Sequence, residues 1–283
     1  MLNDKVLRGL FITGSLLLLI WNLATLGVSP LPWFDEAFYF SMSHNFLNSG
    51  LLEFTFAPPD IPFAPRRYYY GPIYFILTSS AMSVLGENPF GFRMIALLFS
   101  FLLLIPLWWF YGDKRAKIIP LIILMLDPLM ISASHSGRMD TVALFFVLIS
   151  LYYAPIATEK SNNLPRTIIA ALAFAAAILV TPRVYFLGLP FLYFITLQIV
   201  KGKFKPVIIH WLTFGAIILI IYFSWIIYGF GTIGQFLEVY SALMGKFDRV
   251  GLYIPVFHYP LIGLTLLTLI SAVALSFKKM TTD

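Results

Sequence analysis

The sequence has 283 residues, of which 60% are hydrophobic and 11% are charged, whereas soluble domains are about 45–50% apolar and about 25% charged. This composition excludes an ordinary soluble domain and indicates a membrane protein. The net charge is +6, but Lys and Arg stand in short clusters between apolar blocks, which argues against nucleic-acid binding. The absence of cysteine excludes disulfides, thiolate metal sites and cysteine nucleophiles.

The first apolar block, about Leu7 to Val28, is long enough to cross a hydrocarbon core of about 30 Å. It is too long for a signal-peptide core, and residues 29–32 contain no small-residue cleavage site, so we predict a retained first span. The fold class is therefore an all-α integral membrane bundle of about eight transmembrane helices, forming a single membrane domain over residues 1–283. The further predicted spans are about 91–111, 118–136, 140–157, 166–181, 184–200, 207–229 and 256–277.

The positions of the basic residues orient these spans, because five basic clusters fall on one side, which the positive-inside rule assigns to the cytoplasm. Both termini are then cytoplasmic, and most acidic residues fall outside, in a first loop at 29–90 and a second outer loop at 230–255. No eukaryotic retention signal stands at residues 278–283, which favours a prokaryotic plasma membrane. The five clusters are Lys5/Arg8, Lys114/Arg115/Lys117, Lys160/Arg166, Lys201/Lys203/Lys205 and Lys278/Lys279.

The segment Pro72 to Leu85 is apolar but short, and it contains Thr78 and three serines. Counting it as a span would turn the basic cluster at 114–117 outward. We therefore predict a re-entrant or interfacial helix on the outer face.

The first outer loop is far longer than the usual connection of about 4–6 residues, so we expect it to have its own structure and purpose. Asp35 and Glu36 can open a helix that runs to about Asn48 and ends at Gly50, lying along the membrane surface. Asp35 has two interpretations: a simple N-cap, or a carboxylate placed where a membrane lipid meets an aqueous acceptor.

Other charged residues also have more than one interpretation each. Arg138 and Arg183 stand at outer ends of predicted spans, where they can bind phosphate or merely extend to the interface. Asp140 can pair with Arg138, contact an acceptor or help to hold a metal. Asp127 lies inside a predicted span, where an ionised group is costly, so it must face a partner or a donor cavity. The histidines at 44, 135 and 210 show no metal-ligand spacing and stay unassigned.

Five short segments carry a resemblance to a known superfamily over about residues 7–200. They resemble the C-type glycosyltransferases, in particular protein O-mannosyltransferases and bacterial lipid A aminoarabinose transferases. Members are usually longer, so this chain is expected to be a short member, a fragment or a catalytic core. The segments are Asp35-Glu36-Ala37, Gly71-Pro72-Ile73-Tyr74-Phe75, Gly86 with Arg93, Arg138-Met139-Asp140 and Thr181-Pro182-Arg183.

The resemblance implies a glycosyltransferase that moves a sugar from a polyprenyl- or dolichyl-phosphate-linked donor to an acceptor hydroxyl on the extracytoplasmic face, with inversion. The acceptor would be a glycan, a lipid or a protein. Asp35 would be the general base, and Glu36 would orient Asp35 or the acceptor. No cofactor is assigned, and a divalent metal is left open.

The candidate site residues follow from these two lines of argument. Many relatives have a basic residue before the second segment, where this chain has Tyr70 and Gly71, so Arg66 or Arg67 could supply that charge. The catalytic candidates are Asp35, Glu36 and Asp140; the donor-phosphate candidates are Arg66, Arg67, Arg138 and Arg183; the acceptor or sugar candidates are Tyr70, Tyr74, His258 and Tyr259.

Two rival functions remain. A transporter or lipid-sugar flippase would also carry charges within the membrane, but the sequence shows no internal repeat and no matched pair of broken spans. A non-catalytic subunit or fragment of a glycosylation complex is the other rival. An enzyme requires Asp35, Arg138, Asp140 and Arg183 to converge on one outward-opening cavity, whereas a transporter would place its charges near the midplane.

Overall fold

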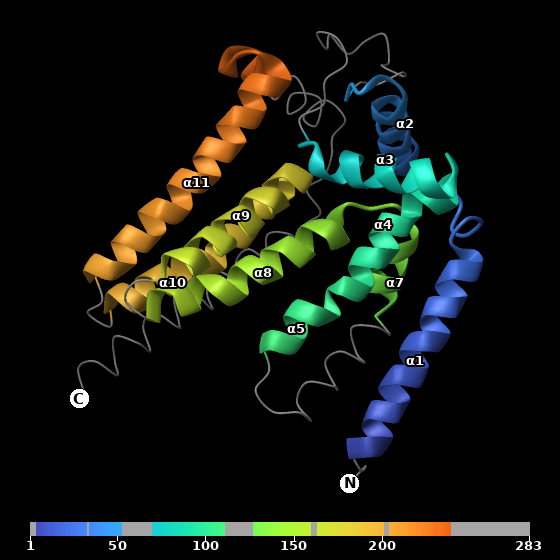
Figure 1. Ribbon diagram of the computed structural model, residues 1–283, viewed down its shortest axis with the longest axis horizontal. Helices are drawn as coiled ribbons and strands as arrows, with labels where there is room; N and C mark the ends of the chain where they lie inside the picture. Colours follow the sequence, from blue (N-terminus) through green and yellow to red (C-terminus); the bar gives the residue numbers. More distant parts are fainter. Residues whose placement is uncertain are drawn as a thin grey trace, which may run out of the picture. The chain divides into compact units, whose positions relative to one another are not determined.

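A computed structural model describes residues 4–32, 34–52, 70–110, 127–159, 163–200 and 204–238. Within these ranges all regular structure is helical, as predicted (Figure 1). The candidates Arg66, Arg67, His258 and Tyr259 lie outside the described residues, as does the predicted span at 256–277. The helices are α1 (Asp4–Thr25), α2 (Phe34–Ser49), α3 (Ile73–Leu85), α4 (Pro89–Leu102), α5 (Leu104–Phe110), α7 (Pro128–His135), α8 (Asp140–Glu159), α9 (Leu164–Val180), α10 (Leu189–Val200) and α11 (Phe204–Phe230), with a 3₁₀ helix at Pro182–Gly188.

The chain separates into two compact units. The first contains residues 1–152 and 173–184, and the second contains residues 153–172 and 185–283. All catalytic candidates that the structure describes belong to the first unit, together with Arg138 and Arg183. The single membrane domain over 1–283 stays a prediction.

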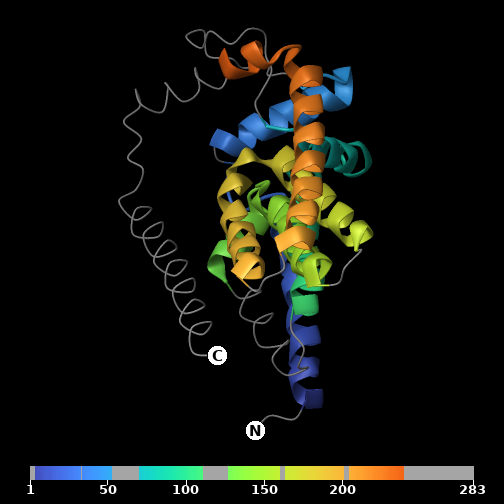
Figure 2. The same ribbon diagram turned by 90° about the vertical axis from the view of Figure 1, so that its left-hand side faces the viewer.

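Helix α1 corresponds to the predicted first span. Its apolar side chains point largely outward, with Leu17 64% and Ile20 63% exposed. Figures 1 and 2 both show the N-terminal half of α1 extending away from the other described helices of its unit. An apolar helix surface of this kind is suited to lipid rather than to water.

Helix α2 is the predicted helix of the outer loop. Asp35 and Glu36 lie in its first turn, where carboxylates interact favourably with the positive end of the helix dipole. It ends at Gly50, which has φ 72° and donates its N–H to Phe46 O at 2.9 Å. A glycine with positive φ is a common helix terminator, so the predicted start and end are both confirmed.

Helix α3 confirms the short helix predicted at Pro72 to Leu85, and it packs against α2 and α4 (Figure 1). Its polar residues serve this packing. Thr78 and Ser79 are buried; the Thr78 and Ser43 hydroxyls lie 2.6 Å apart, and Ser79 Oγ donates to Ser43 O at 2.6 Å. These bonds attach the middle of α2 to α3. The location of α3 at the membrane interface stays a prediction.

Two stretches in the described part are long and apolar enough to cross a membrane: Pro89–Phe110, formed by α4 and α5, and Val207–Phe230 in α11. Helix α4 begins cleanly because Asn88 Oδ1 accepts the N–H of Gly91 at 3.0 Å and Pro89 occupies the first turn, a standard N-terminal pattern. Both stretches correspond to predicted spans, and the total of eight stays a prediction.

The predicted span at 184–200 differs from the structure. The chain forms the 3₁₀ helix Pro182–Gly188 and then α10, Leu189–Val200. Pro190 lacks a backbone N–H, so it fits the first turn of a helix but interrupts a continuous one. We did not predict that a separate helix begins at Leu189.

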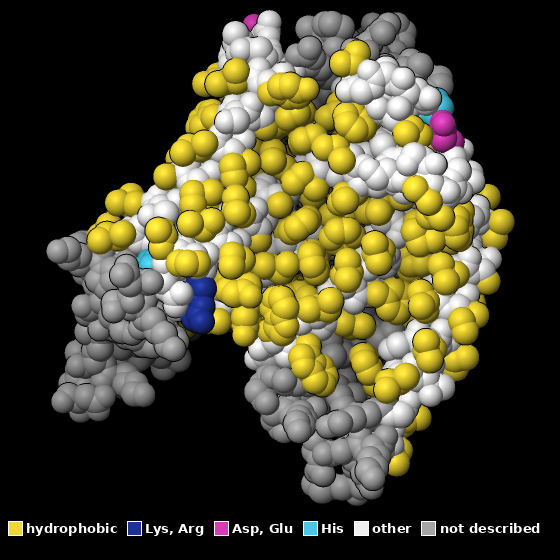
Figure 3. All heavy atoms as spheres, in the orientation of Figure 1, with side chains coloured by type: hydrophobic (Ala, Val, Ile, Leu, Met, Phe, Trp, Pro, Cys, Tyr) yellow, Lys and Arg dark blue, Asp and Glu magenta, His cyan; other side chains and the backbone are white. Residues whose placement is uncertain are grey.

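The surface agrees with a membrane location. On the face shown in Figure 3, hydrophobic side chains cover most of the described residues and charged side chains are few. In the second unit, Leu212 is 68% exposed and Ile220 is 66% exposed on α11. Contiguous apolar surface of this extent is rare on soluble proteins.

Candidate functional site

A buried ion pair lies at the centre of the first unit. Arg93 on α4 is 0% exposed and Glu36 on α2 is 3% exposed. Arg93 donates from Nε to Glu36 Oε1 and from Nη2 to Glu36 Oε2, the latter at 3.0 Å. This is the two-pronged geometry in which a guanidinium fits a carboxylate best.

The other bonds of Arg93 attach the segment that leads into α2. Its Nη1 donates to Leu26 O and its Nη2 to Pro30 O, each at 2.8 Å. One side chain therefore ties the end of α1, the connecting segment and the first turn of α2 to α4. Glu36 is therefore held by this network through both of its carboxylate oxygens.

Asp35 differs from its neighbour. It is half-buried, and its carboxylate makes no hydrogen bond or ion pair with any residue in the described ranges. Because α2 begins at Phe34, Asp35 lies in the first turn and does not act as a side-chain cap for a described N–H. The structure thus leaves this carboxylate available, on a backbone that Glu36 and Arg93 hold in place.

Tyr74 connects α3 to the turn that precedes Arg138. It is fully buried and its hydroxyl donates to Gly137 O. Burial raises the pKa of Tyr74 well above its ordinary value, and the nearby charges of Glu36 and Asp140 raise it further. The phenol therefore remains a protonated donor.

Tyr70 is also buried, at 1% exposure. Its ring meets Tyr39 edge-on at 5.8 Å between centroids, and the two hydroxyls are 3.5 Å apart. Like Tyr74, it lies where it can support the site. An acceptor role for either tyrosine stays an untested prediction.

Gly137 brings a second segment against the ion pair. It has φ 56°, and a Cβ at this position would collide with the Phe92 ring and lie 3.0 Å from Glu36 Oε1. Only glycine fits both the backbone angle and the close approach. The turn that leads to Arg138 and Asp140 is consequently pressed against Glu36.

Arg138 and Asp140 form a pair after this turn. Arg138 Nε donates to Asp140 Oδ2 at 2.6 Å, and the side chains are 38% and 40% exposed. Three roles were considered for Asp140, and of these the structure shows the ion pair with Arg138. In the described ranges no three His, Asp or Glu side chains converge as a metal site would require. A pair this exposed is weak.

The remaining segment of the resemblance lies beside Gly71. A Cβ on Gly71 would overlap the backbone of Leu179, near the end of α9. Two residues later Thr181 Oγ1 accepts the N–H of Arg183 at 3.4 Å, and the Arg183 side chain is exposed. Glycine at 71 therefore brings the start of α3 close to the segment that carries Arg183.

A groove of about 660 Å³ runs between α2 and the start of α4. Glu36 forms part of its wall, as do His44 and Glu87, which form an ion pair. Asp35, Arg138, Asp140 and Arg183 are not among the residues that line it. Their convergence on one outward-opening cavity thus stays a prediction.

The other residues left open by the sequence have local partners. His135 shares a hydrogen bond with Thr25 at 3.1 Å, and His210 shares one with Thr167 at 2.6 Å. Asp127 directly precedes Pro128, where α7 begins, and its carbonyl accepts the N–H of Ile131 at 3.0 Å. These contacts give the two histidines local partners, and the role of the Asp127 side chain stays a prediction.

Two residues whose importance the sequence did not reveal are Arg93 and Gly137. Arg93 was noted only as part of the resemblance, although a charge inside an apolar helix signals a buried partner. Gly137 directly precedes Arg138 in the sequence, but its positive φ cannot be read from its neighbours.

Comparisons with known proteins come from a family model and from solved structures. The model described as "Dolichyl-phosphate-mannose-protein mannosyltransferase" matches residues 70–228. No curated protein matches the sequence. Two crystal structures of ArnT from Cupriavidus metallidurans, one in the apo state and one bound to undecaprenyl phosphate, each match with a TM-score of 0.62 and 17% identity, covering 81% of this chain. The chain spans 42% of the length of those structures.

Proposed function

This chain belongs to the dolichyl-phosphate-mannose-protein mannosyltransferase family, and we propose that it transfers a sugar from a polyprenyl- or dolichyl-phosphate-linked donor. The family match confirms the resemblance to C-type glycosyltransferases, and the chain is accordingly a membrane protein. One matched ArnT structure holds undecaprenyl phosphate, which supports a lipid-phosphate donor for this chain. The matched residues begin at Tyr70, so the assignment of Asp35 rests on its position in the fold.

The reaction is a single displacement on the extracytoplasmic face. The acceptor hydroxyl attacks the anomeric carbon, its proton passes to the Asp35 carboxylate, and the bond from that carbon to the phosphate oxygen breaks. The lipid phosphate leaves with the bonding electron pair, and the sugar inverts at the anomeric carbon. The acceptor is a glycan, lipid or protein hydroxyl.

The observation that carries this proposal is the contrast between Asp35 and Glu36. Glu36 is buried and bound by Arg93, which fixes the first turn of α2, whereas Asp35 has no partner among the described residues. A general base needs a fixed backbone and an open carboxylate. These adjacent residues supply both.

Arg138 and Arg183 are the described candidates for the leaving phosphate, with Arg66 and Arg67 beyond the described residues. Negative charge develops on the phosphate as the bond breaks, and a guanidinium can donate to two of its oxygens. Asp140 keeps Arg138 oriented until the donor arrives.

The test is sugar transfer by purified protein in lipid from a radiolabelled pool of polyprenyl-phosphate sugars. Asp35→Asn should lower turnover by about 10²–10⁴-fold, the usual contribution of a general base, while binding of the labelled donor persists. Glu159→Gln, which removes a carboxylate at the opposite end of α8 from Asp140, is the matched control. Equal turnover in Asp35→Asn and wild type would remove Asp35 from the mechanism. If wild type bound the donor without transferring its sugar, a transport or scaffold function would replace this proposal.

A further inference from the structure

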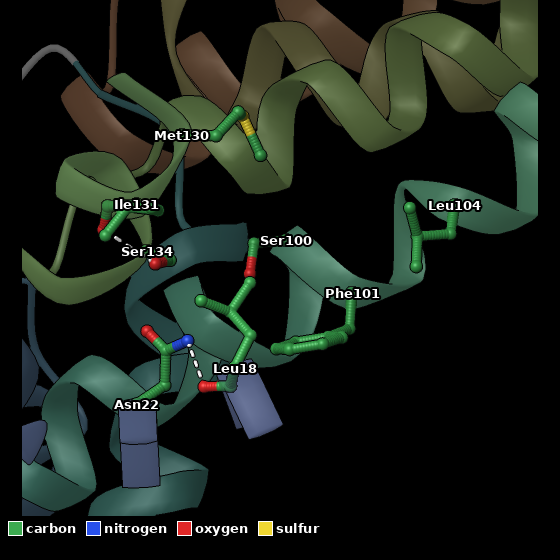
Figure 4. Close-up of a pocket in the computed structure, with 8 residues that line it drawn as sticks. All are labelled: Leu18, Asn22, Ser100, Phe101, Leu104, Met130, Ile131 and Ser134. Carbon is green, nitrogen blue, oxygen red and sulfur yellow. Dashed lines mark hydrogen bonds between the residues drawn. The ribbon is translucent and has the colours of Figure 1, made fainter. Parts of the chain in front are cut away.

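A small, partly open pocket lies between α1, α4, the start of α5 and α7, away from Asp35 and its neighbours. Its volume is about 30 Å³, and a cavity needs about 10–15 Å³ on this scale to hold one water molecule. Figure 4 shows its eight lining residues, among them Asn22, Ser100 and Ser134, one polar side chain from each of the three helices. The space is therefore large enough for one or two waters and too small for a substrate.

Asn22 supplies an unsatisfied acceptor to this pocket. The residue is 2% exposed, and its amide nitrogen donates to Leu18 O at 2.6 Å (Figure 4). Its Oδ1 has no hydrogen-bond partner. Turning the amide over would bring Oδ1 against Leu18 O, two acceptors facing each other, so the orientation is set by this contact.

The two serines also present acceptors. Ser100 Oγ donates to Leu97 O at 2.6 Å, and Ser134 Oγ donates to Ile131 O at 2.8 Å. Each hydroxyl has one hydrogen, so these bonds use the donors and leave oxygen lone pairs. The pocket thus needs a molecule that donates hydrogen bonds.

A metal cation could also bind to these oxygen lone pairs, but the number and type of oxygen ligands distinguish it from water. A cation such as Ca²⁺ takes about 6–8 oxygen ligands, usually including carboxylates, whereas this pocket has three neutral side-chain oxygens and no acidic lining residue. A bare charge in such apolar surroundings is strongly disfavoured. A water has two donors, which match two of the three acceptors.

We propose that this pocket is a binding site for ordered water, which donates to Asn22 Oδ1 and to a serine hydroxyl and so links α1 to α4 and α7. The link lies one helical turn before Leu26, whose N–H bonds to Asn22 O at 2.8 Å. Leu26 O in turn accepts from Arg93. The water therefore steadies the helix end from which the Arg93 network is built.

Thermal unfolding in lipid nanodiscs tests the link with Asn22→Leu, Ser134→Ala and the double variant. With water bound, Asn22→Leu should lower Tm by about 2–4 °C, roughly the shift that loss of one hydrogen bond causes in a chain of this size. The double variant should lose less than the sum of the singles, because both remove the same bridge. Ser83→Ala, which removes an exposed hydroxyl with the same local bond pattern as Ser134, is the control and should leave Tm unchanged.

If the pocket contains no water, the changes in Tm should differ from those expected above. Asn22→Leu would then remove an unsatisfied acceptor and fill space, Tm would stay or rise, and the two substitutions would add independently. Either result would overturn the proposal.

A second measurement does not depend on the variants folding. In a high-resolution density map of the wild-type protein, a peak should lie about 2.7–3.0 Å from Asn22 Oδ1. An empty pocket would contradict the proposal, and a peak that grows when sodium in the buffer is replaced by rubidium would assign a cation instead.

Discussion

Adjacent carboxylates can differ completely in what surrounds them. Glu36 is enclosed and receives two bonds from Arg93, whereas Asp35 is half-buried and open. A buried charge pair is costly to break because removing one partner leaves the other charge uncompensated. An open carboxylate in a first helical turn has no such partner to lose. Substitution of Glu36 should therefore destabilise the fold strongly, whereas substitution of Asp35 should change the stability little.

Glu36→Gln should destabilise the fold by about 3–5 kcal/mol, since it leaves the Arg93 guanidinium buried without a counter-charge. Asp35→Asn should change the unfolding free energy by no more than about 0.5 kcal/mol. Unfolding of both variants in the same lipid system measures the difference. If Asp35→Asn proved as destabilising as Glu36→Gln, the separation of their roles would be wrong.

Tyr74→Phe removes the hydroxyl that satisfies Gly137 O and should cost about 1–3 kcal/mol of stability near neutral pH. The wild-type protein has a second signature. Because the folded state raises the pKa of Tyr74, the folded chain binds more protons than the unfolded chain above the ordinary tyrosine pKa of about 10. The contribution of Tyr74 to stability is therefore fully present below about pH 10 and decreases as the pH rises further.

The Tyr74→Phe variant should not show the part of the stability loss at alkaline pH that comes from ionisation of Tyr74. The two unfolding curves, measured from pH 8 to pH 11, should approach each other at the alkaline end. Parallel curves would mean that Tyr74 ionises as easily in the folded as in the unfolded chain.

At the scale of elements, close approach of backbones decides which segments reach the site. Gly137 places the turn before α8 against Phe92 and Glu36, and Gly71 places the start of α3 against the end of α9. In both places a side chain would force the elements apart. Ordinary glycines differ: Gly14 on α1 has nothing within 4 Å of the position of an added Cβ.

Gly137→Ala should therefore destabilise the protein by about 1–3 kcal/mol, through backbone strain and overlap, and should reduce sugar transfer by displacing Arg138. Gly14→Ala is the matched control. It should be neutral or stabilise the helix by about 0.5–1 kcal/mol, because alanine restricts the unfolded chain. Similar effects of the two substitutions would show that the turn at Gly137 tolerates a side chain.

At the scale of the whole molecule, the chain is a membrane protein whose described helices display apolar surface. The orientation in the membrane still rests on the positive-inside rule. Since the chain has no cysteine, single-cysteine variants offer a clean measurement. A membrane-impermeant thiol reagent should label Ser49→Cys, at the exposed end of α2, in intact cells, and should label Lys279→Cys only after permeabilisation. The reverse pattern would invert the topology and move the proposed site to the cytoplasm.

Much of this architecture could be predicted because its signals are local. The apolar blocks predicted α1, the α4–α5 stretch and α11, since the length and hydrophobicity of a span are set by consecutive residues. The acids at 35 and 36 and the glycine at 50 predicted both ends of α2, because helix ends are determined by one or two side chains and a backbone angle.

The sequence by itself determined the membrane class, the helical fold, the family and the position of Asp35 at a helix start. Which charged side chains form ion pairs became clear only from the tertiary structure. Arg93 meets Glu36 across 57 positions of the chain, and Tyr74 meets Gly137 across 63. Such contacts depend on how α4 and the turn at Gly137 pack around α2, and this three-dimensional packing leaves no pattern among neighbouring residues.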